Sequence, residues 1–376
     1  MRLVVLGLSL SSSWGNGHAT TYRALLRAFA ARGHAVTFLE RDVPWYRAHR
    51  DLPDPDFCRL VLYDGPAVPD GPAGLAGPEG RSGLDAHADL IREADAVMVG
   101  SYVPDGVAVG RFVQSLAAGT TAFYDIDTPV TLAKLDRGDH EYVSPDLVAG
   151  YDLYLSFTGG PTLRRLEDRY GSPRARALYC SVDPDLYPVL DRPARWDLSY
   201  LGTYSADRQP TLERLLLGPA RRRPDLRFAV AGPQYPEDVA WPDNVERFAH
   251  VGPADHAEFY AASRWTLNVT RADMIAAGWS PSVRLFEAAS CAVPIVSDRW
   301  DGMDEVLRPG RDILVAEDGA AVLAALARPE ADRRALGRAG RARVLAAHTA
   351  AHRAGELDAA LSEVARDRRS RPGEVR

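Results

Sequence analysis

The segment Leu267–Asp298, LNVTRADMIAAGWSPSVRLFEAASCAVPIVSD, contains one complete repeat of an α/β fold. An apolar strand at Thr266–Val269 runs into a polar loop, a helix begins near Pro281 or Ser282, and a second apolar strand follows at Pro294–Ser297. A strand, a helix and a strand in this order are typical of neighbouring parallel strands joined by a crossover helix. The segment therefore predicts a parallel sheet that is covered by helices.

Strands and helices alternate through the whole second half of the chain. Short apolar runs separated by helical patterns predict further βαβ units. The predicted strands lie at Asp197–Thr203, Arg227–Ala231, Thr266–Val269, Pro294–Ser297 and Ile313–Val315. The predicted helices lie around Gln209–Leu217, Ala254–Ser263, Ser282–Ala292 and Ala320–Ala327, and a last helical stretch runs from Glu330 to about Ala365.

The first half shows the same alternation. Arg2–Leu10 is a continuous apolar run, which is typical of a strand buried on both faces. The proline-rich segment Asp183–Pro193 then predicts a linker between two α/β domains. Further strands are predicted at His34–Glu40, Asp95–Tyr102, Thr120–Asp125 and Asp152–Phe157.

Size and charge restrict the possible functions. A chain of 376 residues exceeds the usual size of a single hydrophobic core, so two domains are expected. Two βαβ domains in tandem leave a crevice at the carboxyl ends of their sheets, where open α/β sheets bind ligands. The net charge of −6 argues against a nucleic-acid partner. Of the 45 basic residues only Lys134 is a lysine, so a single arginine carries less functional information than usual.

Cysteine spacing and hydropathy exclude other classes. Cys58, Cys180 and Cys291 lie far apart without CxxC spacing, so we expect neither a disulfide framework nor a zinc site. No apolar segment approaches the roughly 20 residues that cross a bilayer, so we expect no integral membrane segment. The apolar start of the chain predicts a first strand rather than a secretory signal, and we expect a cytoplasmic location.

The helix that begins near Ser282 carries the clearest chemistry. Its first backbone N–H groups lack helical partners and favour an anion such as a diphosphate. Arg284 and Glu287 are three residues apart and share one face. Arg284 suits a phosphate, and the Glu287 carboxylate suits two hydrogen bonds from a ribose diol. The alternative is an exposed Arg–Glu helix pair worth a few tenths of a kcal/mol.

Three stretches carry a resemblance to a known family: FYAASRWTLNVTRADMIAAGWSPSVRLFEAASCAVPIVSDRWDGMDEVL, AGPQYPEDVAWPDNV and AHTAAHRAGEL. They resemble the donor-binding domain of GT-B glycosyltransferases, in particular the CgeB-like (spore-maturation protein) family. The resemblance is strong from about Tyr200 to Leu357 and looser before it. It implies an α/β, GT-B fold in which two Rossmann-like domains face their parallel sheets across a cleft.

The resemblance implies three parts of the chain. Residues 1–188 would form an acceptor-side domain and residues 189–345 a nucleotide-sugar domain. Residues 346–376 would be a C-terminal helix that packs back toward the first domain and ends in a frayed basic tail. Glu287 matches the glutamate that binds the nucleotide ribose. Related retaining enzymes carry a second acidic residue eight positions earlier; here that position is Trp279, which leaves stereochemistry and sugar contacts open.

Glycines and arginines complete the implied donor site. The turn Gly202, Thr203, Tyr204 to Arg208 resembles the family's GT-x-x-x-x-R turn, in which glycine lets the backbone approach a phosphate. Arg208 or Arg271 would stabilise the departing diphosphate; the alternative for either is an ordinary surface ion pair. Gly232 ends another strand, where a nucleotide base often packs.

Two groups in the first half are candidates for catalysis. Asn16, Gly17 and His18 join the first strand to the first helix, where GT-B enzymes place an acceptor-side loop, and His18 would deprotonate the acceptor. The alternative is that His18 only makes hydrogen bonds. Asp127, in the D-x-D-T-P pattern that begins at Asp125, is the other candidate base or the partner of His18. We reject a DxD metal site there and expect no metal, because a GT-B enzyme stabilises its leaving group with helix dipoles and cations.

The sequence thus predicts a metal-independent glycosyltransferase of hexosyltransferase type, without a cofactor. Its donor would be a UDP-, GDP- or dTDP-linked sugar, and its acceptor the hydroxyl of a small molecule or polymer. One alternative is a nucleotide-sugar epimerase or hydrolase on the same fold. Another is a non-catalytic nucleotide-sugar-binding protein. A NAD-dependent oxidoreductase is disfavoured because no G-x-G-x-x-G follows a predicted strand.

Overall fold

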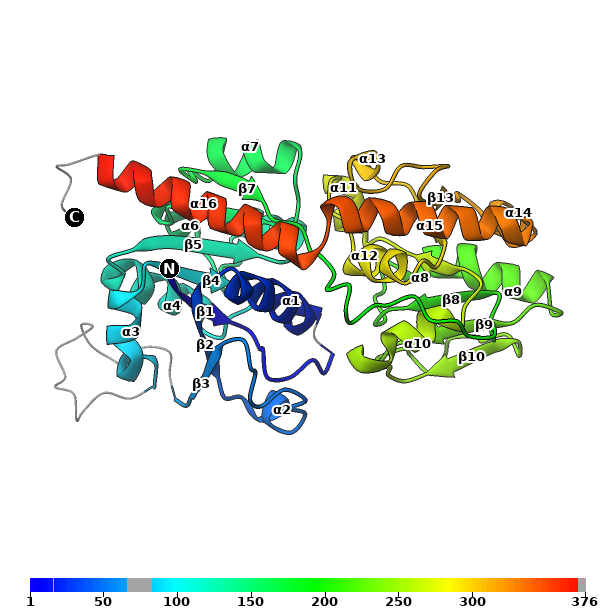
Figure 1. Cartoon of the computed structure of the whole chain (residues 1–376), viewed down its shortest axis with the longest axis horizontal. Coiled ribbons are helices and arrows are strands. Elements are labelled where there is room, and N and C mark those ends of the chain that lie inside the picture. Colours follow the sequence, from blue (N-terminus) through cyan, green and yellow to red (C-terminus); the bar gives the residue numbers. More distant parts are fainter. Residues whose placement is uncertain (16, 66–82, 371–376) are drawn as a thin grey trace. The chain divides into compact units, whose positions relative to one another are not determined.

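The structure is a computed structural model that describes residues 1–15, 17–65 and 83–370. The chain forms two compact units (Figure 1). The first unit comprises Met1–Tyr179 and the C-terminal segment that begins at Ala351; the second comprises Cys180–Ala350. The predicted domain limits at residues 188 and 345 therefore differ by nine and five residues from the divisions after Tyr179 and Ala350.

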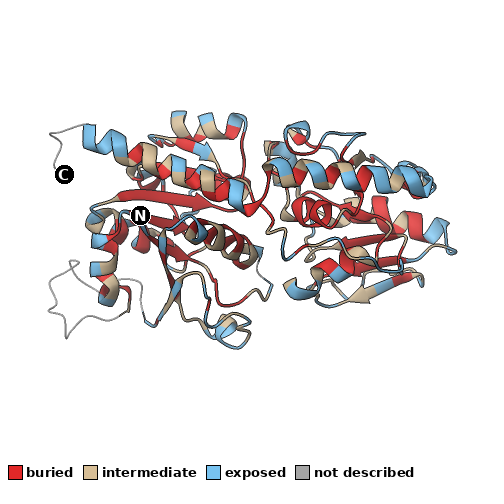
Figure 2. Cartoon of the chain, viewed as in Figure 1, coloured by how far each residue is buried: buried red, intermediate tan, exposed pale blue. Residues whose placement is uncertain are grey.

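The first unit is built on a sheet of seven parallel strands in the order β3-β2-β1-β4-β5-β6-β7. Its central strands β1, β4 and β5 are buried on both faces apart from Arg2, which agrees with their continuous apolar sequences (Figure 2). The strands are β1 (Arg2–Gly7), β2 (Ala35–Arg41), β3 (Arg59–Tyr63), β4 (Ala96–Gly100), β5 (Thr120–Asp125), β6 (Leu153–Ser156) and β7 (Ala175–Ala177).

Helices cover this sheet and bury their apolar faces on it; the longer ones are α1 (Gly17–Ala31) and α4 (Gly106–Leu116). The first unit also contains α2 (Pro44–Arg47), η2 (Gly83–His87), α3 (Ala88–Glu93), α5 (Thr128–Asp136), α6 (Pro145–Gly150) and α7 (Pro161–Asp168). Asn16 and the basic residues Arg371 and Arg376 lie outside the described residues.

The last helical stretch differs from the sequence-based prediction in two ways. It is divided at His348 and Thr349 into α15 (Glu330–Ala347), in the second unit, and α16 (Ala350–Ser370). The predicted frayed basic tail does not include residues 366–370, because α16 continues to Ser370. Ion pairs hold its second half: Arg174 lies 2.6 Å from Asp367, and Arg368 lies 2.6 Å from Asp152.

The second unit is built on six parallel strands in the order β10-β9-β8-β11-β12-β13. The strands are β8 (Leu198–Leu201), β9 (Phe228–Ala231), β10 (Val245–Phe248), β11 (Thr266–Asn268), β12 (Ile295–Ser297) and β13 (Leu314–Val315). The helices, besides α15, are α8 (Gln209–Leu212), η3 (Glu213–Leu217), α9 (Gly218–Arg222), η4 (Pro253–Asp255), α10 (His256–Ala261), α11 (Ala272–Ala277), α12 (Val283–Ser290), α13 (Met303–Val306) and α14 (Gly319–Leu326).

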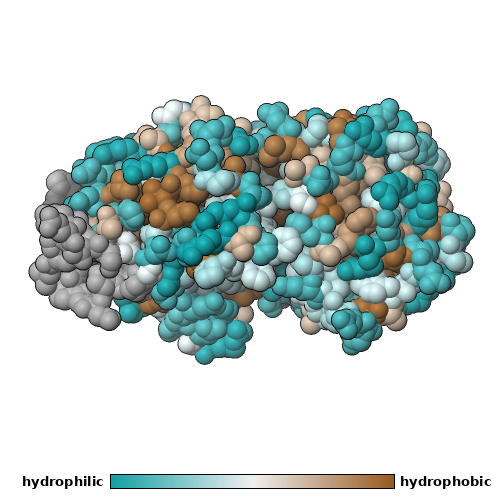
Figure 3. Space-filling model, turned by 90° about the horizontal axis from the view of Figure 1, so that it is seen from below, coloured by the Kyte–Doolittle hydropathy of each residue, from teal (hydrophilic) through white to brown (hydrophobic). Residues whose placement is uncertain are grey.

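On the face in Figure 3, the largest group of apolar residues lies in the first unit, and hydrophilic residues separate the smaller groups. Large exposed apolar side chains such as Trp45 and Ile275 come from different elements. No helix among the described residues has both the length and the apolar character needed to cross a membrane.

Candidate functional site

Two glycines meet where β8 and β9 end in the second unit. Gly202 follows β8 and donates its backbone N–H to Ala231 O over 2.8 Å, and Gly232 follows β9 with a φ of 148°. A Cβ on Gly232 would lie 2.1 Å from Gly202 O, and a Cβ on Gly202 would lie 2.7 Å from Nη2 of Arg284. Position 232 therefore requires glycine, and both glycines bring backbone to the carboxyl end of the sheet, where α/β sheets bind ligands.

Arg284 lies inside this edge of the sheet rather than on the surface. Its side chain donates through Nη1 to Asn268 Oδ1 at 2.8 Å and through Nε to Leu201 O, and its guanidinium carbon is 4.8 Å from the centre of the Tyr200 ring. Arg284 is 6% exposed and Glu287 4% exposed. The alternative of an exposed Arg–Glu helix pair is therefore wrong.

Two further arginines accompany Arg284. Arg208 donates through Nη2 to Thr203 O at 2.6 Å, while its buried Nε has no hydrogen-bond partner among the described residues. Burial lowers the pKa of Arg208, and the positive charges of Arg284 and Arg271 lower it further. Arg271 lies 3.9 Å from the Asp207 carboxylate, Nε to Oδ2. The three arginines concentrate positive charge at this end of the sheet, and the Asp207 carboxylate offsets part of it.

Glu287 has a different environment from the one that its predicted role suggests. Tyr187 donates to its Oε1 at 2.9 Å, Tyr260 donates to its Oε2 at 3.1 Å, and Nδ1 of His256 lies 3.7 Å from Oε2. Burial alone would raise the pKa of Glu287, but His256 and the two tyrosine hydroxyls outweigh it, so the pKa is lowered. The pKa of His256 is correspondingly raised, against its own burial. A ribose diol would have to share or displace these partners.

Ser282 and Trp279 lie at the beginning of α12 and shortly before it. Ser282 is the N-cap residue of α12, and its side chain does not cap the helix. Trp279, which stands eight positions before Glu287, has a φ of 43° and donates through Nε1 to Glu305 at 2.7 Å. A Cβ on Gly302 would lie 2.4 Å from the Trp279 ring, so this glycine allows the indole to lie flat on the backbone. Trp279 is part-exposed and does not fill the core.

An aromatic group beside Gly202 was not predicted from the sequence. Tyr235 donates its hydroxyl to Gly202 O at 3.2 Å, and its ring centre lies 5.5 Å from that of Tyr204. The guanidinium of Arg247 lies 4.1 Å from the Tyr235 ring and 4.0 Å from the Trp241 ring. Tyr235 and Trp241 belong to the AGPQYPEDVAWPDNV stretch. The resemblance of this stretch to the family could have indicated them as site residues.

In the first unit, the two candidate bases belong to one cluster. The His18 ring lies edge-on to the Tyr102 ring at a centroid distance of 5.4 Å, and the Tyr102 hydroxyl donates to Asp127 Oδ2 at 3.0 Å. Burial lowers the pKa of His18 to about 4, because the charged imidazolium is poorly solvated there. His18 is therefore neutral at pH 7 and a weak base. Gly17 begins α1 and is exposed.

Asp125 is directed into the protein and has a structural role. Its Oδ2 accepts a hydrogen bond from Tyr154 at 2.6 Å, and its Oδ1 accepts from Thr131 at 2.8 Å. Burial raises the pKa of Asp125 to about 6, despite these hydrogen bonds. Asp125 thus orients the turn that carries Asp127 at the start of α5, and its oxygens already have protein partners.

Lys134 lies next to this cluster. Its ammonium is 5.7 Å from the centre of the Tyr102 ring and 5.5 Å from that of Tyr142, and it pairs with Glu141. The ammonium of Lys134 thus lies near two aromatic rings and a carboxylate, each of which favours a cation.

Residues 208–359 match the family described as "Glycosyl transferase-like". A search of the curated proteins gave no significant match. The matched residues contain Arg208, Gly232, Arg271, Ser282, Arg284 and Glu287.

Solved structures match nearly the whole chain. Sucrose-phosphate synthase from Thermosynechococcus elongatus has 15% identity and a TM-score of 0.68, with 97% of this chain and 99% of that chain covered. Anabaena HepE in complex with UDP and glucose has 12% identity and a TM-score of 0.70, with 96% and 100% covered. A UDP-N-acetylglucosamine 2-epimerase, so described, from Listeria monocytogenes has 12% identity and a TM-score of 0.58, with 96% of each chain covered. The chain therefore has the GT-B fold with two Rossmann-like domains, as the sequence predicted.

Proposed function

We propose that this chain transfers a hexose from a nucleotide-diphosphate sugar to an acceptor hydroxyl. The observation that carries the proposal is the group of Arg208, Arg271 and Arg284 at the carboxyl end of the second sheet, next to the close backbone approach of Gly202 and Gly232. HepE, a protein of the same fold, is described in complex with UDP and glucose, which supports a uridine diphosphate sugar as the first donor to test.

The donor diphosphate would lie between the glycine turn and the start of α12. Backbone N–H groups and the positive end of the helix favour an anion there. Nε of Arg208 is buried and free to donate to a phosphate oxygen, since no described residue accepts from it. Arg284 is held by Asn268 and Leu201, so it contributes a fixed positive charge rather than a mobile contact.

Catalysis would use the Asp127 cluster of the first unit. Asp127 accepts the proton of the acceptor hydroxyl as its oxygen bonds to the anomeric carbon. The bond from that carbon to the diphosphate oxygen breaks, and the departing diphosphate takes the electron pair. The arginines stabilise the charge that develops on it, so no divalent cation is required in this proposal. A pKa of about 4 makes His18 the weaker candidate base, since a base works best near the operating pH.

The family assignment is also part of the proposal. The match to the glycosyltransferase-like family covers residues 208–359, and the motifs that resemble CgeB-like proteins fall largely in the same part of the chain. We infer that the chain is a CgeB-like enzyme in which Trp279 replaces the acidic residue of the E-x7-E pattern. The indole face, held by Glu305, would then contact the donor where a carboxylate does in retaining relatives.

Thermal denaturation with UDP-glucose, GDP-mannose and dTDP-glucose tests donor binding. A donor that binds the folded chain raises the melting temperature, because binding stabilises by RT ln(1 + [L]/Kd). Arg208→Gln should abolish this rise, whereas Arg338→Gln, which removes an exposed arginine on α15, should leave it unchanged. If all three donors failed with the unsubstituted chain, donor binding would be refuted for these bases.

Product analysis separates the proposal from its alternatives. Proton NMR of the anomeric signals should show a glycoside only when an acceptor is present. A new sugar configuration without acceptor would indicate an epimerase, an activity for which the Listeria protein of the same fold is named. Free sugar alone would indicate a hydrolase, and an unchanged donor that still binds would indicate a binding protein.

A further inference from the structure

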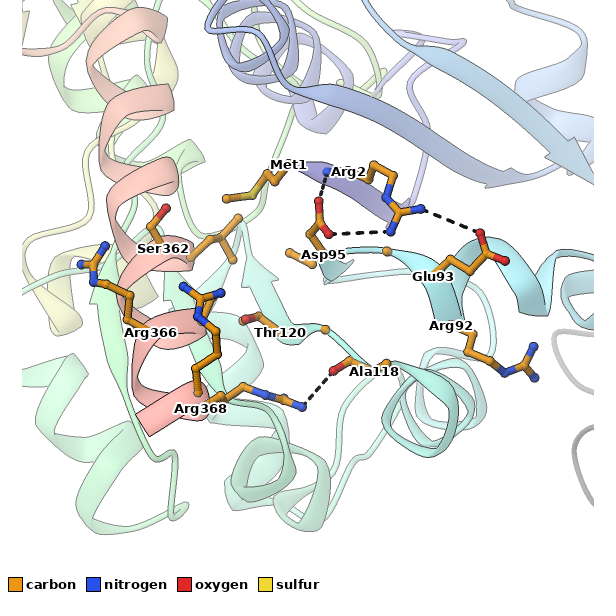
Figure 4. Close-up of a pocket in the computed structure, with 16 residues that line it drawn as sticks. Met1, Arg2, Arg92, Glu93, Asp95, Ala118, Thr120, Ser362, Arg366 and Arg368 are labelled. Carbon is orange, nitrogen blue, oxygen red and sulfur yellow. Dashed lines mark hydrogen bonds and ion pairs between the residues drawn. The ribbon is translucent and has the colours of Figure 1, made fainter. Parts of the chain in front are cut away.

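A cavity of about 690 Å³ lies in the first unit at the amino ends of its central strands (Figure 4). Residues at the starts of β1, β4 and β5 form one wall, and α16 forms the other. His18, Tyr102 and Asp127 follow the carboxyl ends of the same three strands. The cavity is therefore at the opposite end of the sheet from the proposed base.

The cavity concentrates positive charge in a chain whose net charge is −6. Its lining includes Arg2, Arg92, Arg366, Arg368 and Arg369, against the carboxylates of Glu93 and Asp95 only. Both carboxylates pair with Arg2, each at 3.8 Å, on the strand side of the cavity (Figure 4). The lining therefore has a clear excess of guanidinium groups.

Two of these arginines are not neutralised. Arg92 pairs with Asp89, and Arg368 pairs with Asp152. The guanidinium groups of Arg366 and Arg369 have neither an ion pair nor a hydrogen bond with any residue in the described ranges. Ser362, Arg366 and Arg369 follow one another at helical spacing, so they share one face of α16.

Two acidic residues of the same helix, Glu363 and Asp367, form ion pairs outside the cavity. Glu363 lies 3.5 Å from Arg174, and Asp367 lies 2.6 Å from Arg174. Both acidic residues are therefore directed at Arg174, which stands before β7, and away from Arg366 and Arg369. The amphipathic charge pattern of α16 thus leaves a cationic face on the cavity.

Thr120 supplies an independent polar group. It is 2% exposed, lines the cavity at the start of β5, and its Oγ1 has no hydrogen-bond partner among the described residues. Figure 4 shows this side chain between β5 and α16. A buried hydroxyl without a partner is unfavourable, and a ligand oxygen would satisfy it.

We propose that this cavity binds a small phosphorylated molecule, whose phosphate lies between Arg366 and Arg369 and accepts a hydrogen bond from Thr120. Guanidinium groups match the planar arrangement of phosphate oxygens, and two of them on one helix face suit a dianion. The volume falls in the usual range of about 300–1,000 Å³ for small-molecule sites. The inference concerns a second site and does not depend on the proposed transferase activity.

Isothermal titration calorimetry with pyrophosphate tests the site on the whole chain. The unsubstituted chain should bind pyrophosphate at the cavity and, if the proposed function holds, also at the arginines of the donor site. Arg366→Gln/Arg369→Gln should lose one binding event or weaken it at least tenfold. Arg328→Gln/Arg338→Gln, which removes two exposed arginines of the second unit, is the matched control and should bind as the unsubstituted chain does.

Two further substitutions distinguish binding at the cavity from binding at the donor site. Arg208→Gln should remove the donor-site event and keep the cavity event, so failure of one proposal is distinguishable from failure of the other. Thr120→Val should weaken cavity binding at least threefold while the chain keeps its melting temperature, since the buried hydroxyl has no protein partner to lose. Circular dichroism confirms that each variant is folded.

The preferred ligand and the effect of the double substitution decide whether the cavity is a phosphate site. Tighter cavity binding of glucose 6-phosphate would identify a sugar phosphate, and tighter binding of UMP a nucleotide; both support it. Equal pyrophosphate binding by the Arg366→Gln/Arg369→Gln chain and its control would overturn it. Binding of an RNA or DNA duplex alone, lost in the same variant, would also overturn it in favour of a nucleic-acid surface.

Discussion

The hydroxyl of Tyr102 donates to Oδ2 of Asp127 over 3.0 Å, from a residue whose backbone has a φ of 61°. A non-glycine residue in this left-handed region is strained by roughly 1–3 kcal/mol and is found preferentially at functional sites. The contacts of the Tyr102 ring with His18 and of its hydroxyl with Asp127 accompany this backbone conformation. Tyr102 is thus a positioning residue for the proposed base.

Tyr102→Phe should lower kcat about tenfold and leave the KM for the donor unchanged, because the carboxylate loses its orientation but the donor site is untouched. Steady-state kinetics at varied donor concentration measure this split. Tyr170→Phe is the control, since it removes a comparable hydroxyl-to-carboxylate bond, to Asp136, elsewhere in the first unit. A rise in KM alone would contradict the positioning role.

His18 should make the stability of the chain pH-dependent. Its folded pKa of about 4 lies below its ordinary value of 6.5, so the unfolded chain binds more protons between these values. The folded state is therefore favoured fully above pH 6.5 and loses stability as the pH falls toward 4. Urea unfolding at pH 7.5 and pH 5 should show a loss of about 1–2 kcal/mol that is absent in His18→Leu. Equal losses in both chains would contradict the assignment.

Tyr187→Phe discriminates between two roles of Glu287. The substitution removes one hydrogen bond to Oε1 and should cost about 1 kcal/mol of unfolding free energy. If Glu287 binds the ribose, the freed oxygen should also strengthen donor binding, measured by calorimetry. If Glu287 only ties Tyr187 and Tyr260 to α12, donor affinity should not change.

Arg284 and Arg208 should respond differently to substitution. Arg284→Met leaves the buried Asn268 Oδ1 and Leu201 O without their donor and should destabilise the chain by about 2–3 kcal/mol. Arg208→Gln removes a charge that its neighbours repel and should cost little stability, while donor affinity falls at least tenfold. Chemical denaturation combined with donor titration checks both. Similar stability losses in the two variants would contradict this division.

Gly232→Ala should be severely destabilising, by more than about 3 kcal/mol, because the new Cβ would lie 2.1 Å from Gly202 O. Gly138→Ala is the matched control: Gly138 also has a positive φ, of 74°, but nothing lies within 4 Å of its ideal Cβ. Gly138→Ala should cost about 1 kcal/mol of unfolding free energy, because only the unfavourable positive φ opposes an alanine there. Comparable melting temperatures for both variants would contradict the close approach.

The sequence predicted the central strands well and the sheet edges poorly. β5 was placed at Thr120–Asp125, where the structure has it, because a strand buried on both faces reads as an unbroken apolar run. The missed strands β3, β7 and β10 all lie at sheet edges, with one side unpaired, and β7 is only Ala175–Ala177. Charged residues in such strands remove the apolar signal on which the prediction rests.

The candidate site shows a similar division. Gly202, Gly232 and Arg284 could be proposed from spacing and resemblance, and the structure brings them together. The inward direction of Glu287 could not, since it depends on Tyr187, which comes from the proline-rich segment 100 residues earlier. The short helix α11 was also missed, because Ala272–Ala277 lies between a strand and a proline and is too short for a clear period.

Lys134 gives the chain a single lysine side chain that can be labelled selectively. It is the only lysine, its side chain is 20% exposed, and it lies beside Tyr102 and Tyr142. Reagents that acylate side-chain amines, which on most proteins react at many positions, have one lysine target here. A fluorescent ester at Lys134 would therefore place its label beside Tyr102, the residue that donates to Asp127.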